Sequence, residues 1–281
     1  MKRTSKSVLI SGCIFFGLFY ACTKDNSSAN SSDNETQTAT DNLLAESIAN
    51  DVTTVSAQSE DNGTSGSYGT SSVNLLLSPC ATVIIDYTST PNRLTIDYGN
   101  TNCLCLDGKY RRGKILVAYT GFYRDSASVH TIGFNNYYVN DYKVEGTQTV
   151  VNKGHNAAGN LVFSVKTNGS LIDTAGRTLT FKSDRMREWI AGEATDGLNQ
   201  WQDDVYSITG TASGTDFSGE AYTAEIKSPL VFSLSCQWIE AGKFDFKPQG
   251  ELTRTIDFGS GNCDNKASVS IAGFTINIIM E

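Results

Sequence analysis

Seven cysteines are the residues of this 281-residue chain whose types and spacing point most directly to chemistry. One of them, Cys22, follows Ala21 and the apolar run at residues 8–20, and that run comes after a basic start. A basic start, an apolar run too short to cross a bilayer and a small residue before the cut are the parts of a secretory signal peptide. A cysteine directly after the cut is typical of a lipoprotein, in which the thiol is acylated, for instance with palmitate. We therefore predict a signal peptide over residues 1–21 and lipidation at Cys22.

Two further stretches are near copies of each other, and each ends in a cysteine. Six of nine positions are identical between residues 95–103 and residues 255–263, and each copy follows a β-rich run, a proline turn and an earlier cysteine. Each half therefore predicts a β-hairpin with cysteines at its open end, where two sulfurs can be joined with ordinary geometry. Export places the thiols in an oxidising compartment, in which disulfides persist. The predicted bridges are Cys80–Cys103 and Cys236–Cys263.

Cys105 is the cysteine that this pairing leaves over, because the second copy has Asn265 at the corresponding place. Cys103 and Cys105 could also suggest a metal or redox pair, but the oxidising compartment favours bridging. Oxygen-bearing side chains within residues 257–265 could hold Ca²⁺, whereas the glycines among them suit a tight turn without any ion. We predict no metal site and no cofactor.

A basic segment, residues 108–115, imitates a phosphate-binding loop in composition. It lacks the Ser or Thr that would hold Mg²⁺, and a strand-like run follows it where a helix N-terminus is required. A hairpin loop explains the segment better and leaves a basic spot on an acidic protein, which could grip an anionic sugar or a lipid headgroup. A plain solvated loop is the more frequent explanation of such a run. The candidate ligand-binding residues are Lys109, Tyr110, Arg111, Arg112 and Lys114.

Motifs of known catalytic chemistry are missing from the sequence. The two histidines, His130 and His155, stand apart from each other, and neither His-Glu-x-x-His nor Gly-x-Ser-x-Gly occurs. We therefore predict no catalytic residue and no enzymatic activity. Carboxylate pairs of the glycosidase type stay open, because 30 acidic residues offer many pairs whose separation the sequence does not show.

Three tryptophans offer a different use of the surface. Trp189, Trp201 and Trp238 could form a platform on which sugar rings stack. Aromatic residues of strands usually belong to the core or to cross-strand pairs, so the platform is an alternative rather than the first expectation.

The charge of the mature chain limits its partners. Three of the 22 basic residues lie in residues 1–21, so removal of the signal peptide leaves 19 basic residues against 30 acidic ones, a formal net charge of −11. Such a charge argues against nucleic acid and against electrostatic attraction to an anionic bilayer. The lipid must therefore hold the protein at the membrane.

Two regions follow the signal peptide. Residues 22–72 are predicted to be an acylated tether that ends in a Gly/Ser linker, with one short amphipathic helix at about residues 41–58. That helix could dock on the rest of the protein or on a partner, or it could fray in solution, and the short length favours fraying. Residues 73–281 predict an all-β domain, because turn residues recur between β-branched and aromatic runs. An antiparallel meander of this length forms a β-sandwich or one long curled sheet, and we expect the sandwich.

Short motifs are spread over the exported domain, at residues 111–115, 135–140, 144–147, 187–189, 204–210, 228–231 and 263–265. Together they are similar to a family of uncharacterised, exported, β-rich Bacteroidota lipoproteins. The resemblance implies attachment to the outer membrane through the lipid, and Lys24 with its acidic neighbour suggests exposure at the cell surface. It implies no activity.

The sequence thus favours a lipid-anchored protein of the cell envelope with a non-catalytic structural or interaction role. A carbohydrate-binding or adhesive module is the first alternative, and a glycan hydrolase is the second. The expected partners are the membrane, through the N-terminal lipid, and a glycan or another envelope protein, with no nucleic acid.

Overall fold

The computed structural model describes residues 28–64, 80–195 and 201–280. The predicted signal peptide and the predicted lipidation site Cys22 lie outside these ranges.

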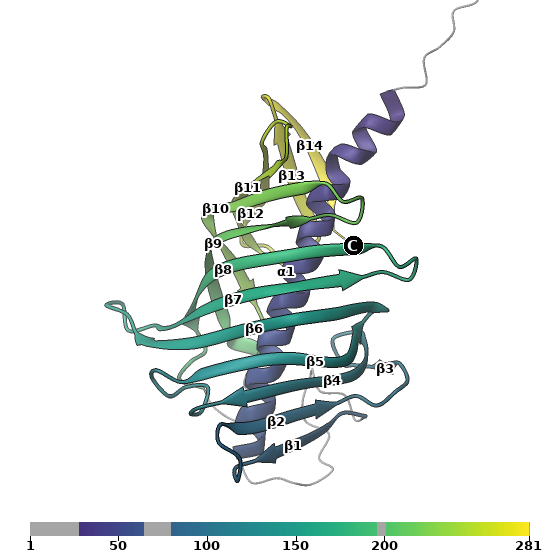
Figure 1. Cartoon of the computed structure of the whole chain (residues 1–281). Helices are drawn as coiled ribbons and strands as arrows, with labels where there is room; N and C mark the ends of the chain where they lie inside the picture. The colour runs from purple at the N-terminus through teal and green to yellow at the C-terminus, as the bar shows by residue number, and fades with distance from the viewer. Residues whose placement is uncertain (1–27, 65–79, 196–200, 281) are drawn as a thin grey trace, which may run out of the picture.

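Fourteen antiparallel strands form one open sheet that curls along its length (Figure 1). The strands pair in chain order from β1 to β14, except that β3 lies beside β4 and off the main path. Their bounds are β1 Thr82–Asp86, β2 Asn92–Asp97, β3 Cys103–Leu104, β4 Tyr110–Tyr119, β5 Val129–Val139, β6 Tyr142–His155, β7 Leu161–Ile172, β8 Thr178–Ala191, β9 Val205–Thr215, β10 Ala221–Ser233, β11 Ala241–Pro248, β12 Arg254–Ser260, β13 Lys266–Ile271 and β14 Phe274–Ile279, with a 3₁₀ turn η1 at Trp201–Asp203.

The all-β prediction is confirmed, and of its two forms the structure has the long curled sheet rather than the sandwich that we expected. The reason is a helix that the sequence pattern underestimates. One face of the sheet, here called the inner face, packs against this helix, so no second sheet is needed to cover its apolar side chains.

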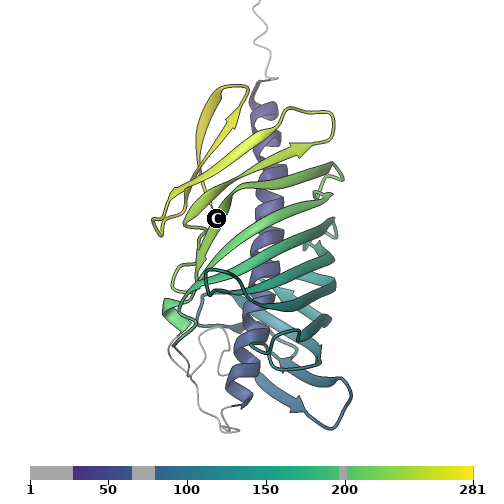
Figure 2. The same ribbon diagram turned by 90° about the vertical axis from the view of Figure 1, so that its left-hand side faces the viewer.

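Helix α1, Ser28–Thr64, runs across the strands through the curl, from the β14 end of the sheet to the β1 end (Figures 1 and 2). Its 37 residues make it about 55 Å long. The predicted helix at about residues 41–58 is therefore real but too short in the prediction, and it docks on the β-domain rather than fraying. Contacts with the sheet supply the stability that an isolated helix of this composition lacks.

Alternation along the strands explains which side chains meet the helix. In β8, every second residue from Leu179 to Trp189 is buried except Ser183, which is half-buried, and the buried ones include Arg185 and Arg187. Apolar α1 residues such as Ile48, Val52 and Val55 belong to the same buried cluster as the inner-face side chains. The core of the protein thus lies between one helix and one face of one sheet.

Short turns of the expected kind connect the strands. Asn140 and Asp141 between β5 and β6 both have positive φ, 46° and 66°, as a two-residue type I′ hairpin requires. Ala272 and Gly273 between β13 and β14 repeat this arrangement with φ of 50° and 88°. These turns keep each strand beside the one that follows it in sequence.

Both predicted cysteine pairs lie at disulfide distance. The Cα atoms of Cys80 and Cys103 are 6.3 Å apart, those of Cys236 and Cys263 are 5.7 Å apart, and Cys105 is a buried free thiol. Each bridge joins the flanks of a hairpin, which confirms the pairing inferred from the repeat.

The two copies of the repeat also share their polar contacts. Asp97 and Asp257 each accept a hydrogen bond from the backbone N of the glycine two residues on, at 2.9 Å in both cases. Each carboxylate also pairs with a lysine at 2.7 Å, Lys114 of β4 for Asp97 and Lys243 of β11 for Asp257. The lysine strand follows the repeat in the first copy and precedes it in the second, so the copies agree in chemistry and differ in surroundings.

Candidate functional site

The basic loop of the sequence does not form a free basic surface. Arg111 is fully buried with 0 % exposure, because alternation along β4 turns it to the inner face. The backbone beside it forms a bulge at Gly113, where φ is +82° and a Cβ atom would lie 1.8 Å from the carbonyl oxygen of Asn136. The local geometry therefore depends on glycine and fixes the direction of Arg111.

The remaining cations of the loop are also paired. The Nζ atom of Lys109 lies 3.1 Å from Asp51 of α1. Arg112 pairs with Asp141 and lies over the ring of Tyr138, and Lys114 pairs with Asp97. Tyr110 is the exposed member of the set. The expected basic spot is therefore wrong as a free surface, because acidic residues of β2, of the turn between β5 and β6 and of α1 neutralise it.

The most unusual chemistry lies on the inner face, under α1. Five basic side chains of the described sheet are buried. Arg254 of β12 pairs with Glu251. The other four each contact α1, and we call them the inner-face basic residues: Arg111 of β4, His130 of β5, Arg185 and Arg187 of β8. Charged side chains are almost never fully buried unless they are paired, so the partner of each one matters.

Arg111 is shared by two carboxylates. Its Nη2 atom lies 2.5 Å from Asp51 of α1, and its Nη1 atom donates to Asp107 at 2.8 Å. Burial alone would raise the pKa of Asp51, but the charges of Arg111 and Lys109 outweigh it and lower the pKa below its ordinary value. Asp51 is therefore a charged carboxylate inside the protein, held there by two cations.

Arg185 and His130 each meet one glutamate of α1. Arg185 donates to both oxygens of Glu46, from Nε at 3.1 Å and from Nη2 at 2.7 Å. This two-point contact is the strong form of the arginine–carboxylate pair. The Nε2 atom of His130 lies 2.7 Å from Glu60, and the imidazole stacks on Tyr119.

Arg187 differs from the other three. It is 2 % exposed, its Nη2 atom donates to Thr54 of α1 at 3.2 Å, and its guanidinium lies over the ring of Tyr206 at 3.6 Å. Among the described residues it forms no ion pair, and its Nε and Nη1 atoms have no hydrogen-bond partner. Burial raises the pKa of Asp204 and the positive charge of Arg187 opposes this rise, although the two side chains form no ion pair.

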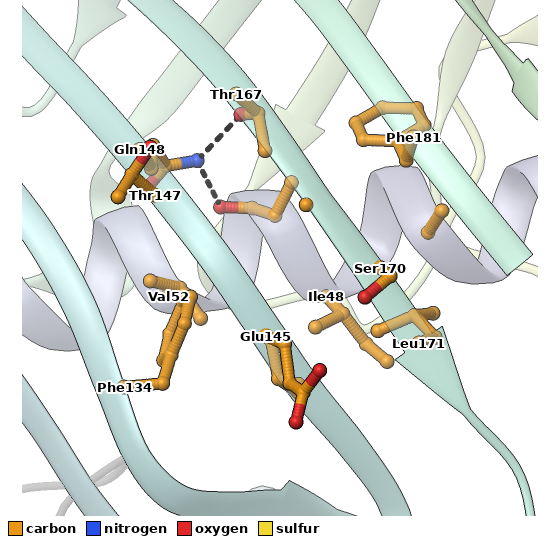
Figure 3. Close-up of a pocket in the computed structure, with 14 residues that line it drawn as sticks. Ile48, Val52, Phe134, Glu145, Thr147, Gln148, Thr167, Ser170, Leu171 and Phe181 are labelled. Atoms are coloured by element: carbon orange, nitrogen blue, oxygen red, sulfur yellow. Dashed lines mark hydrogen bonds between the residues drawn. The ribbon is translucent and has the colours of Figure 1, made fainter. Parts of the chain in front are cut away.

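Neutral polar contacts and a small cavity complete this interface. Gln148 of β6 donates to the carbonyl of Ala49 at 3.0 Å and to Thr167 of β7 at 3.1 Å (Figure 3). It also accepts from Thr53 at 2.9 Å, so it fixes one turn of α1. Beside it, a cavity of about 30 Å³ lies between Ile48, Val52 and the side chains of β5 to β8, including Phe181. That volume corresponds to about one water molecule, too little for an organic ligand while α1 is in place.

Asp204, next to η1, is a buried carboxyl with an unusual protonation equilibrium. Burial raises its pKa to about 7, and the charge of Asp203 adds to the rise, while Arg124 and Arg187 act in the opposite direction. Its neighbour Trp189 is buried under Arg124. At neutral pH this carboxyl therefore exists in both protonation states.

The outer face of the sheet has a broad, polar hollow over β8 to β11. Its volume is about 620 Å³. Hydroxyl and charged side chains line it, among them Lys182, Asp184, Thr211, Thr223, Glu225 and Asp245. The carboxylates have partners already: Asp184 pairs with Lys166, Glu225 with Lys227, and Asp245 accepts from Thr255.

The other candidate residues of the sequence lie apart from one another. Trp189 is buried, Trp238 is half-buried, and the side chain of Trp201 lies outside the described part of the structure. His155 is at the surface and pairs with Glu193. The described side chains of Cys236, Glu240 and Cys263 come within metal-binding distance of one another, but the two cysteines form a disulfide with each other.

No helix among the described residues combines the length and the apolar character that crossing a bilayer requires. No protein-family model, curated protein or solved structure matches this chain.

The sequence pattern missed the inner-face basic residues other than Arg111. Arg185 and Arg187 share one face of β8 with Phe181 and Trp189, and this alternation was the available signal. Their partners could not be found in the same way, because Glu46 lies 139 residues from Arg185 along the chain.

Loss of the carboxylate in Glu46→Ala should lower the free energy of unfolding by about 3–5 kcal/mol, because it leaves Arg185 buried without an anion. Asp184→Ala is the matched control. Its pair with Lys166 is exposed, with side chains 57 % and 64 % accessible, and should change stability by less than about 1 kcal/mol. Urea unfolding of both variants measures the difference. Equal effects would contradict the structural role of the buried pair.

The raised pKa of Asp204 makes stability depend on pH. The stabilisation is fully present below the ordinary pKa of 3.8 and is lost as the pH rises through about 7, because the folded protein holds the proton more tightly. The advantage of wild type over Asp204→Asn should therefore fall by on the order of 2–3 kcal/mol between pH 5 and pH 8. Unfolding free energies of both proteins across this range give the difference directly, and a flat difference would contradict the raised pKa.

Proposed function

We propose that this protein is a lipid-anchored cell-envelope protein with a non-catalytic, interaction role. Its sequence begins with the parts of a lipoprotein signal, and its predicted lipid at Cys22 stands six residues before Ser28, where α1 begins.

The position of α1 is the observation that carries this proposal. The helix that follows the predicted lipid is bonded to β8 through Glu46 and Arg185, to β4 through Asp51 and Arg111, and to the turn between β9 and β10 through Thr38 and Asp216. An anchor attached to such a helix holds the whole sheet at a membrane, and a flexible tether alone would not fix its position in this way.

The chemistry of the described titratable groups supports a role in binding rather than catalysis. Both histidines pair with glutamates, and the carboxylates of the outer hollow pair with lysines or a hydroxyl group. These contacts hold the groups in structural positions. Asp204, whose pKa is raised to about 7, is the exception among them, but its 7 % exposure gives a substrate little access to its carboxyl.

Anchoring depends on the thiol of Cys22. Cys22→Ser in the native host should move the protein from the membrane fraction to the soluble fraction, because no acyl chain can then be attached. Cys105→Ser is the control, since that thiol is buried in the β-domain and should leave the distribution unchanged. A Cys22→Ser protein that sediments with membranes as wild type does would refute the anchor.

A glycan-binding role is the second candidate, and the outer hollow is what favours it. Sugars present many hydroxyl groups, and the hollow offers hydroxyl and charged side chains over about 620 Å³. The buried position of Trp189 argues against the tryptophan platform as the means of binding.

A glycan array with the Cys22→Ser protein tests this second candidate. If a glycan binds in the hollow, the double variant Lys182→Ala/Glu225→Ala should lose at least about tenfold in affinity, as the loss of two polar contacts predicts. Lys266→Ala, an exposed lysine outside the hollow, is the control. Recovery of the intact glycan after incubation distinguishes binding from hydrolysis, and an array without any bound glycan would remove the candidate.

A further inference from the structure

We infer that the inner face of the sheet is a binding site for an anionic amphiphile, and that α1 fills this site in the ligand-free protein. The inference deepens the interaction role proposed above and rests on it. It assigns a ligand class to the inner-face basic residues, which a purely structural account leaves partly unexplained.

The first step concerns charge. The anions that meet Arg111, His130 and Arg185 include three carboxylates of one helix: Asp51, Glu60 and Glu46. A row of basic groups on the sheet is thus neutralised largely by α1. If α1 leaves, the row faces the space that α1 occupied and attracts other anions.

The second step is that α1 leaves some hydrogen-bond donors of the inner-face basic residues without a partner. Arg187, buried to 98 %, has two nitrogen atoms without a hydrogen-bond partner among the described residues, and Nη1 of Arg185 is in the same condition. Unsatisfied buried donors of this kind are rare and costly in folded proteins. A phosphate or carboxylate group placed near Arg187 would satisfy donors that α1 does not.

The third step concerns the reason for arginines at this place. Buried ion pairs seldom stabilise a fold more than well-packed apolar side chains of similar volume would. Arginine is the side chain best suited to bind phosphate and carboxylate groups at two points. A face that only had to hold a helix would therefore not need three buried guanidinium groups, whereas a face that binds anions would.

The fourth step defines the rest of the ligand. The inner face also carries many apolar side chains, among them Ile115, Phe163 and Phe181, and α1 covers this face with Ile48 and Val52. A ligand without an apolar part would leave a large hydrophobic surface in water once α1 moved away. The ligand that fits both parts has an anionic head and a hydrocarbon chain.

Displacement of α1 requires that the ligand bind the open inner face more tightly than it binds the closed protein. The anionic head meets Arg187 and Arg185, which lie two residues apart on the same face of β8, and the hydrocarbon chain replaces the apolar side of the helix. The cavity beside Ile48 and Val52 marks a place where the helix and the sheet already fit imperfectly.

Two measurements on the soluble full chain, Cys22→Ser, test the proposal. Native mass spectrometry measures binding of lysophosphatidylglycerol, oleate, lysophosphatidylcholine and inorganic phosphate, with the lipids below their micellar concentrations. Hydrogen exchange then follows the backbone amides of residues 41–60 of α1. We expect lysophosphatidylglycerol or oleate to bind and to raise the exchange rates of these amides at least tenfold, while lysophosphatidylcholine and phosphate do neither. The preference between the first two identifies the head as phosphate or carboxylate.

Arg187 supplies the matched variants, because among the described residues it forms no ion pair, and its charge acts on the Asp204 carboxyl only without direct contact. Arg187→Gln should weaken binding of the anionic lipid at least tenfold, and Arg187→Lys should restore part of the loss. Lys166→Gln, an exposed side chain, should bind as wild type does.

Several outcomes would overturn the proposal. Binding without faster exchange in α1, or binding that Arg187→Gln leaves unchanged, places the lipid elsewhere. If lysophosphatidylcholine binds as tightly as the anionic lipids, recognition of a negative charge is excluded. If phosphate alone raises the exchange rates in α1, the need for a hydrocarbon chain is excluded. Failure of all four ligands also overturns it, and because Cys22 is absent from these experiments, none of these results bears on anchoring.

Discussion

Neutralisation of buried charge between α1 and the inner face is the constraint on which the rest of the structure depends. Apolar side chains alone would let a helix slide or rotate over a sheet at small cost, because the hydrophobic effect has no direction. Ion pairs and hydrogen bonds between fixed partners do not permit this. Glu46, Asp51 and Glu60 are separated by about 8 Å and about 14 Å along the helix axis, and each must meet its own partner on β8, β4 or β5. A shift of one turn would break all three pairs at once.

The same contacts explain why a single sheet suffices. A long open sheet must curl, split into two layers or cover its apolar face in another way. Here the helix enters the curl and supplies the covering layer, so β4 to β10 need no opposing strands. The two ends of the sheet are less protected: Ile84 of β1 and Phe274 and Ile276 of β14 are exposed.

Features of the protein that depend on neighbours in sequence could be predicted, and those that depend on distant partners could not. The two cysteine-ended hairpins, the turns at Asn140-Asp141 and Ala272-Gly273 and both disulfides follow from patterns within about 30 residues, and the structure confirms them. The turn that the sequence suggests at Asn168-Gly169 is wrong, because these residues lie inside β7. The extent of α1 and the burial of Arg111 follow from contacts across 60 residues, such as Asp51 with Arg111, and across 139 residues, such as Glu46 with Arg185. A polar segment with low helix propensity and a basic run next to a turn both have ordinary explanations when these partners are unknown. The choice between sandwich and curled sheet failed for the same reason, because the layer that decides it is the helix.

The buried arginines could serve to fix the position of α1 or to bind an anion, and the contacts of Arg187 distinguish these two explanations. Charge pairs that fix the position of a helix are an established use of buried polar groups, and Arg111 and Arg185 fit that use because each has a carboxylate on α1. Arg187 gives α1 one hydrogen bond, to Thr54, and no ion pair. Burial of its guanidinium therefore destabilises the folded protein, while its single hydrogen bond does little to fix the position of α1. The ring of Tyr206 offsets part of that cost through a cation–π contact. The charge of Arg187 also acts on Asp204, but the two form no ion pair. An anion from outside the chain would satisfy the Nε and Nη1 donors that these contacts leave without a partner among the described residues.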